Sequence, residues 1–130
     1  MILHIEQKEK YMILVIEDEE VIRLIYRNHI ESFGYSVICA ENGKIGLDLF
    51  RKHQQQIKII IIDMIMPVLN GLDTLRLIRD ISPLIPVIIS SGFIKHEIRK
   101  ELQILGVHNI LSKPFQKEEL LKTLKKIIND

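Results

Sequence analysis

The sequence is poor in several features that would indicate particular classes of protein. It has one cysteine in 130 residues, Cys39, which excludes an intramolecular disulfide. Because Cys39 lies in an apolar segment, we expect a reduced interior thiol, which is typical of a cytoplasmic protein. No apolar run approaches the roughly 18 residues that suggest a membrane helix, and the first residues lack a signal-peptide pattern. We therefore expect a protein outside the membrane, localised in the cytoplasm.

An excess of one charge is also missing. The 18 lysines and arginines nearly balance the 17 aspartates and glutamates, which gives a formal net charge of +1. A chain with this net charge has no overall positive electrostatic potential that would attract nucleic acid or an anionic membrane, so we expect neither as a partner. The five histidines have no metal-ligand spacing. With 47% hydrophobic residues the length suits one domain, predicted over residues 11–130 after an N-terminal extension over residues 1–10.

Short apolar runs alternate with helical patterns along the chain. Four isoleucines precede Asp63, and a run that is apolar on both faces predicts a parallel strand covered by helices. The predicted strands are Tyr11–Ile16, Tyr35–Ala40, Ile59–Asp63, Pro86–Ile89 and Val107–Leu111. Each is followed by helical spacing, over Val21–Phe33, Ile45–Phe50, Leu72–Ile78, Ile94–Leu105 and Gln116–Ile128. This alternation predicts an α/β fold, a parallel sheet with right-handed crossovers and helices on both faces.

The helical patterns also predict which residues face the core. In the first helix Val21, Ile22 and Ile25 occur at helical spacing with Ile30, opposite a polar face. Gly34 is expected to end this helix as a C-cap. The last helix is expected to bury Leu120, Leu121, Leu124, Ile127 and Ile128. Its lysines indicate a solvated face rather than a nucleic-acid surface.

Four of the predicted strands end in polar residues, which a parallel sheet brings to one edge. The endings are Glu17-Asp18, Asp63, Ser91-Gly92 and Lys113. Clustered carboxylates repel and need a cation, and Mg²⁺ prefers such oxygen ligands together with a phosphate. The Ser91 hydroxyl, the Gly92 N–H and the Lys113 ammonium can each meet a phosphoryl oxygen. Asp63 can then act as a nucleophile that forms an acyl phosphate.

Each of these residues has an ordinary structural explanation. An aspartate that closes a strand is common turn chemistry, and the acidic run from Glu17 to Glu20 suits the solvated start of a helix. Ser91 could cap the following helix, and Lys113 could lie on the surface. Their occurrence at successive strand ends favours a phosphoryl site over four separate coincidences.

The chain resembles the receiver domains of response regulators in two-component and phosphorelay signalling, including chemotaxis receivers. The resemblance covers about Tyr11 to Ile128. Four motifs carry it, in order: Ile13–Glu19, Asp63–Pro67 with Asn70-Gly71, Pro86–Gly92, and Lys113–Phe115. It implies a flavodoxin-like, doubly wound sheet of five parallel strands in the order 2-1-3-4-5, with five helices.

The resemblance also implies a function. Asp63 would accept a phosphoryl group from a phosphohistidine on a sensor histidine kinase or a histidine phosphotransfer protein. Mg²⁺ would be held directly by Asp18, Asp63 and the Ile65 carbonyl, and by Glu17 through water. Lys113 would pair with the phosphoryl group, and Ser91 would shift toward it. The domain would catalyse its own phosphorylation and dephosphorylation and would not be an enzyme in the usual sense.

Further implications concern the output. A downstream protein would bind the face formed by the fourth helix, the fifth strand and the last helix, and a phosphorylation-dependent homodimer is compatible with the family. The bond between Lys113 and Pro114 would be cis, although only about 5–6% of X–Pro bonds are.

The sequence departs from the family pattern at two places, Glu17 and Ile110. Glu17 replaces the first of two aspartates, and we expect the longer side chain to serve the same metal. Ile110 replaces the aromatic that usually reports phosphorylation, which predicts a weaker change at the output surface. Ile65 and Phe93 are apolar and flank the phosphoryl position, so we expect slow hydrolysis because neither orients a water.

Two other functions fit parts of the pattern. A pseudo-receiver, which only mediates interactions, is disfavoured because Asp18, Asp63, Ser91 and Lys113 are all present. A magnesium-dependent phosphatase with an aspartyl nucleophile would carry a second acid two residues after it, where this chain has Ile65.

Overall fold

Five strands and five helices alternate in the part of the chain that the computed structural model describes, residues 11–128. The strands are β1 Met12–Ile16, β2 Ser36–Ala40, β3 Ile57–Asp63, β4 Val87–Ser91 and β5 Asn109–Ser112. The helices are α2 Glu20–Ser32, α3 Gly43–Lys52, α4 Gly71–Ile81, α5 His96–Ile104 and α6 Lys117–Ile128. All neighbouring strands are parallel, in the order β2-β1-β3-β4-β5, which confirms the expected fold. The predicted extension over residues 1–10 lies outside the described residues, as do residues 129–130.

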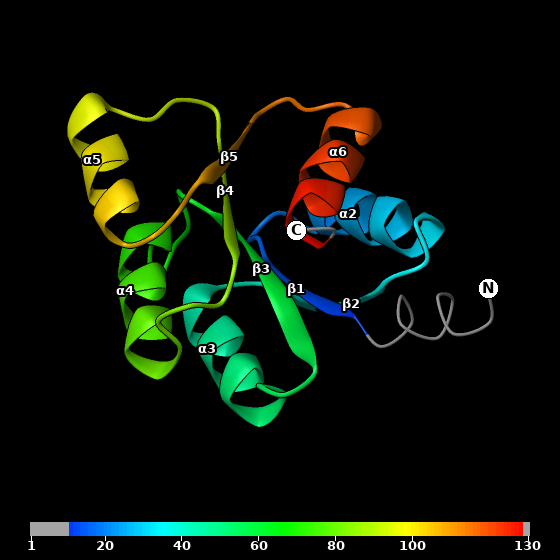
Figure 1. Ribbon diagram of the computed structural model, residues 1–130, viewed down its shortest axis with the longest axis horizontal. Coiled ribbons are helices and arrows are strands. Elements are labelled where there is room, and N and C mark those ends of the chain that lie inside the picture. Colours follow the sequence, from blue (N-terminus) through cyan, green and yellow to red (C-terminus); the bar gives the residue numbers. More distant parts are fainter. Residues whose placement is uncertain (1–10, 129–130) are drawn as a thin grey trace.

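The sheet separates two apolar layers. Helices α2 and α6 lie on one side of it, and α3, α4 and α5 lie on the other (Figure 1). Successive side chains of a strand point to opposite faces, so Ile59 and Ile61 of β3 pack toward α2 and α6. Ile60 and Ile62 pack toward the other three helices. Since all four are at most 1% exposed, the isoleucine run is buried on both faces, as predicted.

Local sequence signals fix several helix ends. The side chains of Asn42 and Asn70 cap α3 and α4, where each Oδ1 accepts a backbone N–H at 2.8 Å. Gly34 and Gly106 follow α2 and α5 with φ of 95° and 78°, the left-handed conformation that glycine adopts at little cost. The predicted glycine cap of the first helix is therefore confirmed.

The predicted buried face of α2 is wrong in part. Val21 and Ile25 are 67% and 41% exposed, whereas Tyr26 and Ile30 are buried in the layer that α2 shares with α6. Packing against the sheet sets the rotation of a helix, and here the large Tyr26 ring lies against the core. The spacing of the smaller apolar residues did not indicate this rotation.

Other expectations need smaller corrections. The last strand begins at Asn109 rather than Val107, because the Val107 N–H still bonds the Leu102 carbonyl at 2.9 Å after α5. In α6, Leu120 and Leu124 are buried, but the three other residues expected there are only half-buried. Cys39 is free and half-buried rather than interior. Within residues 11–128, no helix is both long and apolar enough to cross a membrane.

Candidate functional site

The carboxyl ends of the strands bring the predicted polar residues to one edge of the sheet. Asp63 is the last residue of β3 and is in register with Ser90 of β4. Ser91 ends β4, and its carbonyl accepts the Lys113 N–H at 2.9 Å. Glu17 follows β1, next to Asp18. The site is thus assembled from chain segments far apart in the sequence, each of which leaves a strand.

Lys113 connects the two most buried carboxylates. Its Nζ donates to Glu17 Oε1 at 2.8 Å and to Asp63 Oδ1 at 3.2 Å. Glu17 is 1% exposed and Asp63 is 7% exposed, so water cannot replace the ammonium as their main partner. Partial burial opposes the charge on Lys113, but the hydrogen bond that it donates to Glu17 and the charge of Asp63 raise its pKa, so the amine stays protonated. One cation thereby serves two buried anions.

Glu17 is the electrostatically costly member of the cluster. Burial raises its pKa from 4.5 to about 7, Lys113 opposes this shift, and Asp63 and Asp18 add to it. A carboxyl with such a pKa is ionised in only part of the molecules at neutral pH. The metal-free cluster is therefore short of positive charge.

The three acids form a set of ligands that fits Mg²⁺. One carboxylate oxygen from each of Glu17, Asp18 and Asp63 lies within 4.8 Å of the other two. The donors are all oxygens, and a small hard cation would relieve the repulsion that burial strengthens. The fit to a divalent cation rests on this geometry and on the incomplete neutralisation by Lys113.

Ser91 and Gly92 lie beside the cluster, and the Ser91 hydroxyl is hydrogen-bonded to its own loop rather than to a carboxylate. The Ser91 hydroxyl donates to the Phe93 carbonyl at 3.0 Å, which holds it against its own loop. A Cβ built on Gly92 would meet no atom within 4 Å, so open space surrounds the backbone there. The side chains of Ile65 and Phe93 are 77% and 79% exposed. Apolar groups are thus presented to solvent from both loops that leave the site.

Two supporting residues escaped the sequence analysis. The Arg23 guanidinium donates to the carbonyls of Glu17 and Asp18 at 2.9 and 2.8 Å, so α2 fixes the backbone that carries both acids. Gly71, at the start of α4, packs so closely that a Cβ would lie 2.5 Å from the Asp63 carbonyl oxygen. In the sequence, Gly71 was recognised only as part of a family motif, while an arginine on the polar face of a helix gave no signal for a backbone contact.

The high pKa of Glu17 predicts a pH-dependent stability. Between pH 4.5 and 7 the folded protein holds a proton that the unfolded chain has lost, so without metal its free energy of unfolding falls as pH rises, by up to a few kcal/mol. Bound Mg²⁺ favours the ionised form and should remove this loss. Thermal unfolding from pH 5 to 8, with and without Mg²⁺, measures both effects. The Glu17→Gln variant should show a flatter profile; an unchanged profile would assign the dependence to other groups.

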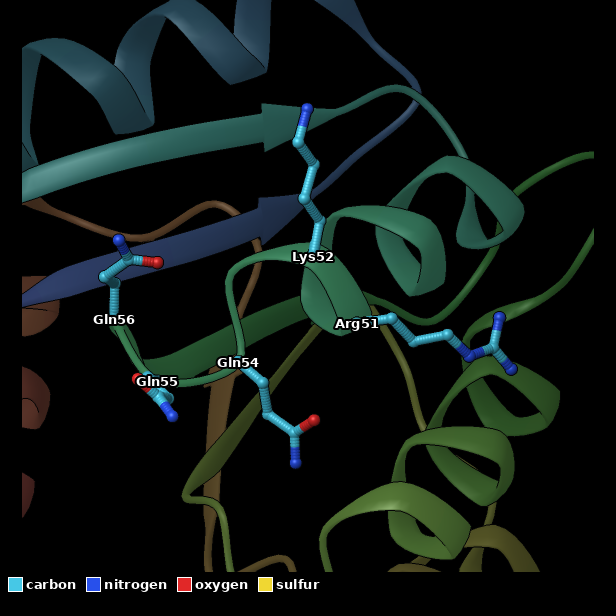
Figure 2. Close-up of a pocket in the computed structure, with 5 residues that line it drawn as sticks. All are labelled: Arg51, Lys52, Gln54, Gln55 and Gln56. Atoms are coloured by element: carbon cyan, nitrogen blue, oxygen red, sulfur yellow. The ribbon is translucent and has the colours of Figure 1, made fainter.

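A surface hollow lies at the opposite end of β3 from Asp63. Arg51 and Lys52, at the end of α3, line it together with Gln54, Gln55 and Gln56. These five side chains point in different directions and do not converge on a common point (Figure 2). The hollow therefore offers no chemistry that competes with the carboxylate cluster.

Comparison with known proteins agrees with this architecture. Residues 13–125 match the family model described as the response regulator receiver domain. The chain is 34% identical over 124 residues to a probable transcriptional regulatory protein of Picosynechococcus, covering 92% of this chain and 49% of that protein. The chain therefore spans about half the length of that relative.

Two solved structures are similar over nearly their whole length. A response regulator receiver domain protein from Clostridium thermocellum has a TM-score of 0.85 at 33% identity, over 92% of this chain and 94% of that one. The receiver domain of the sensor histidine kinase PA1611 from Pseudomonas aeruginosa has a TM-score of 0.77 at 27% identity, over 92% and 98%. That structure holds a magnesium ion in its active-site cleft. With its family match, strand order and fold, this chain belongs to the response regulator receiver domains of two-component signalling.

Proposed function

We propose that this receiver domain is a phosphoacceptor in which Asp63 takes a phosphoryl group from a phosphohistidine. The observation that carries the proposal is the Lys113 ammonium held between Glu17 and Asp63 at the carboxyl edge of the sheet. A nucleophilic carboxylate needs a fixed orientation and neutralisation of the charge that builds up during transfer. This arrangement supplies both. A pseudo-receiver would have no use for it, and an aspartyl phosphatase would carry a second acid where this chain has Ile65.

Asp63 is oriented for attack by one of its two oxygens. Oδ1 accepts from Lys113, which leaves Oδ2 to form the new bond to phosphorus. The phosphorus–nitrogen bond of the donor breaks as this bond forms, and the donor imidazole takes up a proton as it leaves. The product is an aspartyl phosphate, whose additional negative charge must be neutralised at the same edge.

Three residues are assigned to the transferred group. The Lys113 ammonium turns toward a phosphoryl oxygen, and the Gly92 N–H meets another in the open space around it. The Ser91 hydroxyl breaks its bond to the Phe93 carbonyl and donates to the third. The movement of Ser91 therefore rearranges the loop that follows β4, which carries the change toward the surface.

Asp18 and Asp63 would hold Mg²⁺ directly, with the Ile65 carbonyl as a further ligand and Glu17 acting through water. The bound ion would neutralise the charge that develops on the transferring phosphoryl oxygens. The chain's own contribution is to fix these ligands, through the Arg23 contacts to Glu17 and Asp18 and the close packing of Gly71 on Asp63.

The partners follow from the same chemistry. The donor is a sensor histidine kinase or a histidine phosphotransfer protein. The output is binding of a downstream protein at the face of α5, β5 and α6. Because Ile110 of β5 has no aromatic ring to move, we expect a weaker change there on phosphorylation. A phosphorylation-dependent homodimer is compatible with the proposal. We place the protein in the cytoplasm, and we expect neither nucleic acid nor a membrane as a partner.

Intact mass spectrometry tests the proposal directly. The protein incubated with Mg²⁺ and acetyl phosphate should gain one phosphoryl group, and a chelator should prevent the gain. Hydroxylamine cleaves acyl phosphates and leaves phosphoserine intact, so it should remove the group if Asp63 carries it and not if Ser91 does. A protein that never gains the group would instead be a pseudo-receiver, for which Mg²⁺ binding should be measured separately.

The exposed apolar residues beside the site predict a slow loss of phosphate. Ile65 cannot orient a water, whereas an Ile65→Asn variant could, so its acyl phosphate should decay roughly threefold to tenfold faster. The decay is followed by intact mass after the donor is removed. Val68→Asn is a matched control, because Val68 is equally exposed on the same loop and its φ of 69° is one that asparagine tolerates. Decay of Ile65→Asn at the wild-type rate would refute the shielding role.

A further inference from the structure

Two buried hydroxyl groups lie in the core below the acidic cluster. Tyr26 of α2 and Ser90 of β4 are each 1% exposed. Within residues 11–128, neither Tyr26 Oη nor Ser90 Oγ has a hydrogen-bond partner. Burial of an unpaired hydroxyl costs free energy, and an apolar side chain would pack at either position without that cost. The pair therefore calls for an explanation, and the assigned site residues do not supply one.

The alternation of side chains places this pair on the same side of the sheet as Asp63. Ile61 and Ile88 pack into the layer between the sheet and helices α2 and α6, which also contains Tyr26. Asp63 and Ser90 stand two residues further along the same two strands and are in register with each other. They therefore leave the sheet toward the layer that holds the Tyr26 ring.

The Tyr26 phenol is a neutral hydrogen-bond donor in the field of the carboxylates. Burial raises its pKa far above the ordinary value, the nearby Ser90 hydroxyl lowers it, and the charges of Glu17 and Asp63 raise it again. Its ring is fixed by Phe115, at 5.1 Å between ring centroids. An immobilised phenol that keeps its proton can serve a carboxylate but cannot itself become an anion.

We propose that Tyr26 is a positioning residue for phosphotransfer, whose hydroxyl donates to the Glu17 carboxylate when Lys113 turns from Glu17 to the phosphoryl group. The inference rests on the proposed function. Glu17 now accepts from Lys113 at 2.8 Å through Oε1 and from the Glu19 N–H at 3.3 Å through Oε2. Because Glu17 is almost fully buried, Oε1 needs another donor once the ammonium leaves. Ser90 completes the arrangement by donating to Tyr26 Oη. In the unphosphorylated protein neither hydroxyl has a hydrogen-bond partner within residues 11–128. On phosphorylation Tyr26 donates to Glu17, and Ser90 donates to Tyr26.

Phosphorylation kinetics test the proposal. The wild type, Tyr26→Phe and Ser90→Ala are incubated with saturating Mg²⁺ and acetyl phosphate, and phosphoryl gain is followed by intact mass. Tyr26→Phe should react about tenfold more slowly, because the hydrogen bond to the buried Glu17 charge forms as Lys113 turns during transfer and is missing from the transition state of the variant. Ser90→Ala should show a smaller loss of about threefold. Tyr35→Phe, the same substitution at a buried tyrosine of the same layer, should match the wild type.

A spectroscopic signal separates positioning from simple packing. The chain has three tyrosines and no tryptophan, so its near-ultraviolet absorption reports on phenol groups. A phenol that donates to a carboxylate absorbs at longer wavelength, and phosphorylation should produce this shift in the wild type and in Tyr35→Phe but not in Tyr26→Phe. If Tyr26 served packing alone, Tyr26→Phe would lower thermal stability in the resting protein, and phosphorylation would produce no such shift in the wild type.

The outcomes distinguish the two proposals. If the wild type gains no phosphoryl group, the proposed function fails and this inference fails with it. If the wild type is phosphorylated and Tyr26→Phe reacts at the same rate with the same absorption shift, only the role of Tyr26 is refuted. Should Tyr26→Phe not fold, a wild-type rate in Ser90→Ala would refute the hydroxyl pair, and a slower rate would support it.

Discussion

An Asp63→Asn variant should gain no phosphoryl group from acetyl phosphate and Mg²⁺, and its metal-free form should be more stable than the wild type. An amide has the shape of the carboxylate, but its oxygen is not a nucleophile that forms a stable phosphoryl adduct. The same change removes one of two buried anions that share a single ammonium, which relieves repulsion within the cluster. We expect a gain of about 1–2 kcal/mol in the free energy of unfolding, because a change of about one pKa unit in an interacting group corresponds to a free energy of this size.

Intact mass and urea unfolding measure the two parts of this prediction on the same sample. Asp48→Asn is the matched control, because Asp48 lies on the exposed surface of α3 and forms a long, solvated pair with Arg51 at 3.7 Å. It should keep both phosphorylation and wild-type stability. Phosphoryl gain by Asp63→Asn would show that another residue is the acceptor. A loss of stability would show that Asp63 is held mainly by favourable bonds.

A Lys113→Met variant should lose phosphorylation activity and stability together. Methionine keeps the apolar stem but removes the cation that orients Asp63 and pairs with the transferred group. Removal of one preorganised electrostatic group of this kind lowers rates by about 10²–10³. In the resting protein, loss of charged hydrogen bonds to Glu17 and Asp63 should cost about 1.5–3 kcal/mol at pH 8. Near pH 6 the cost should shrink, because Glu17, with its pKa of about 7, is then mostly protonated.

Single-turnover phosphorylation and unfolding at the two pH values check these effects. Lys122→Met on the exposed face of α6 provides the control, and it should change neither quantity. An equal loss of stability at pH 6 and pH 8 would mean that Lys113 stabilises the fold by packing of its stem. A wild-type rate would remove Lys113 from the transfer step.

The sequence predicted the α/β fold class and the edge at which the polar residues meet because both follow from periodicity, whereas the strand order followed only from the resemblance to receiver domains. An isoleucine run indicates a strand buried on both sides, and parallel strands deliver their endings to one edge. Which residues then contact each other could not be predicted this way. The bond between Glu17 and Lys113 joins residues 96 positions apart and depends on how two flexible side chains settle around Asp63.

The rotation of α2 limited the prediction most. Helical spacing favoured Val21 and Ile25 as core residues, yet both are exposed, while Tyr26 is buried with its hydroxyl under the site. Helical spacing shows that a helix has an apolar stripe, but it does not show whether a tyrosine or two smaller aliphatic residues will face the core. The tyrosine ring fits there only if the sheet and α6 leave room for it. The Arg23 contacts to the backbone were missed for the same reason, because they depend on the rotation of α2.

The four consecutive isoleucines of β3 are chemically interchangeable, so the core alone cannot distinguish one alignment of this strand from another. If one of them were deleted, every remaining position would still be filled by an isoleucine of the correct size. Asp63 would then stand one step earlier and leave the sheet on the face of α3, α4 and α5, among apolar groups and away from Lys113. The burial of a carboxylate without a cation makes that alignment unfavourable. Asp63 therefore also fixes where strand β3 must end, which the isoleucine core cannot do by itself.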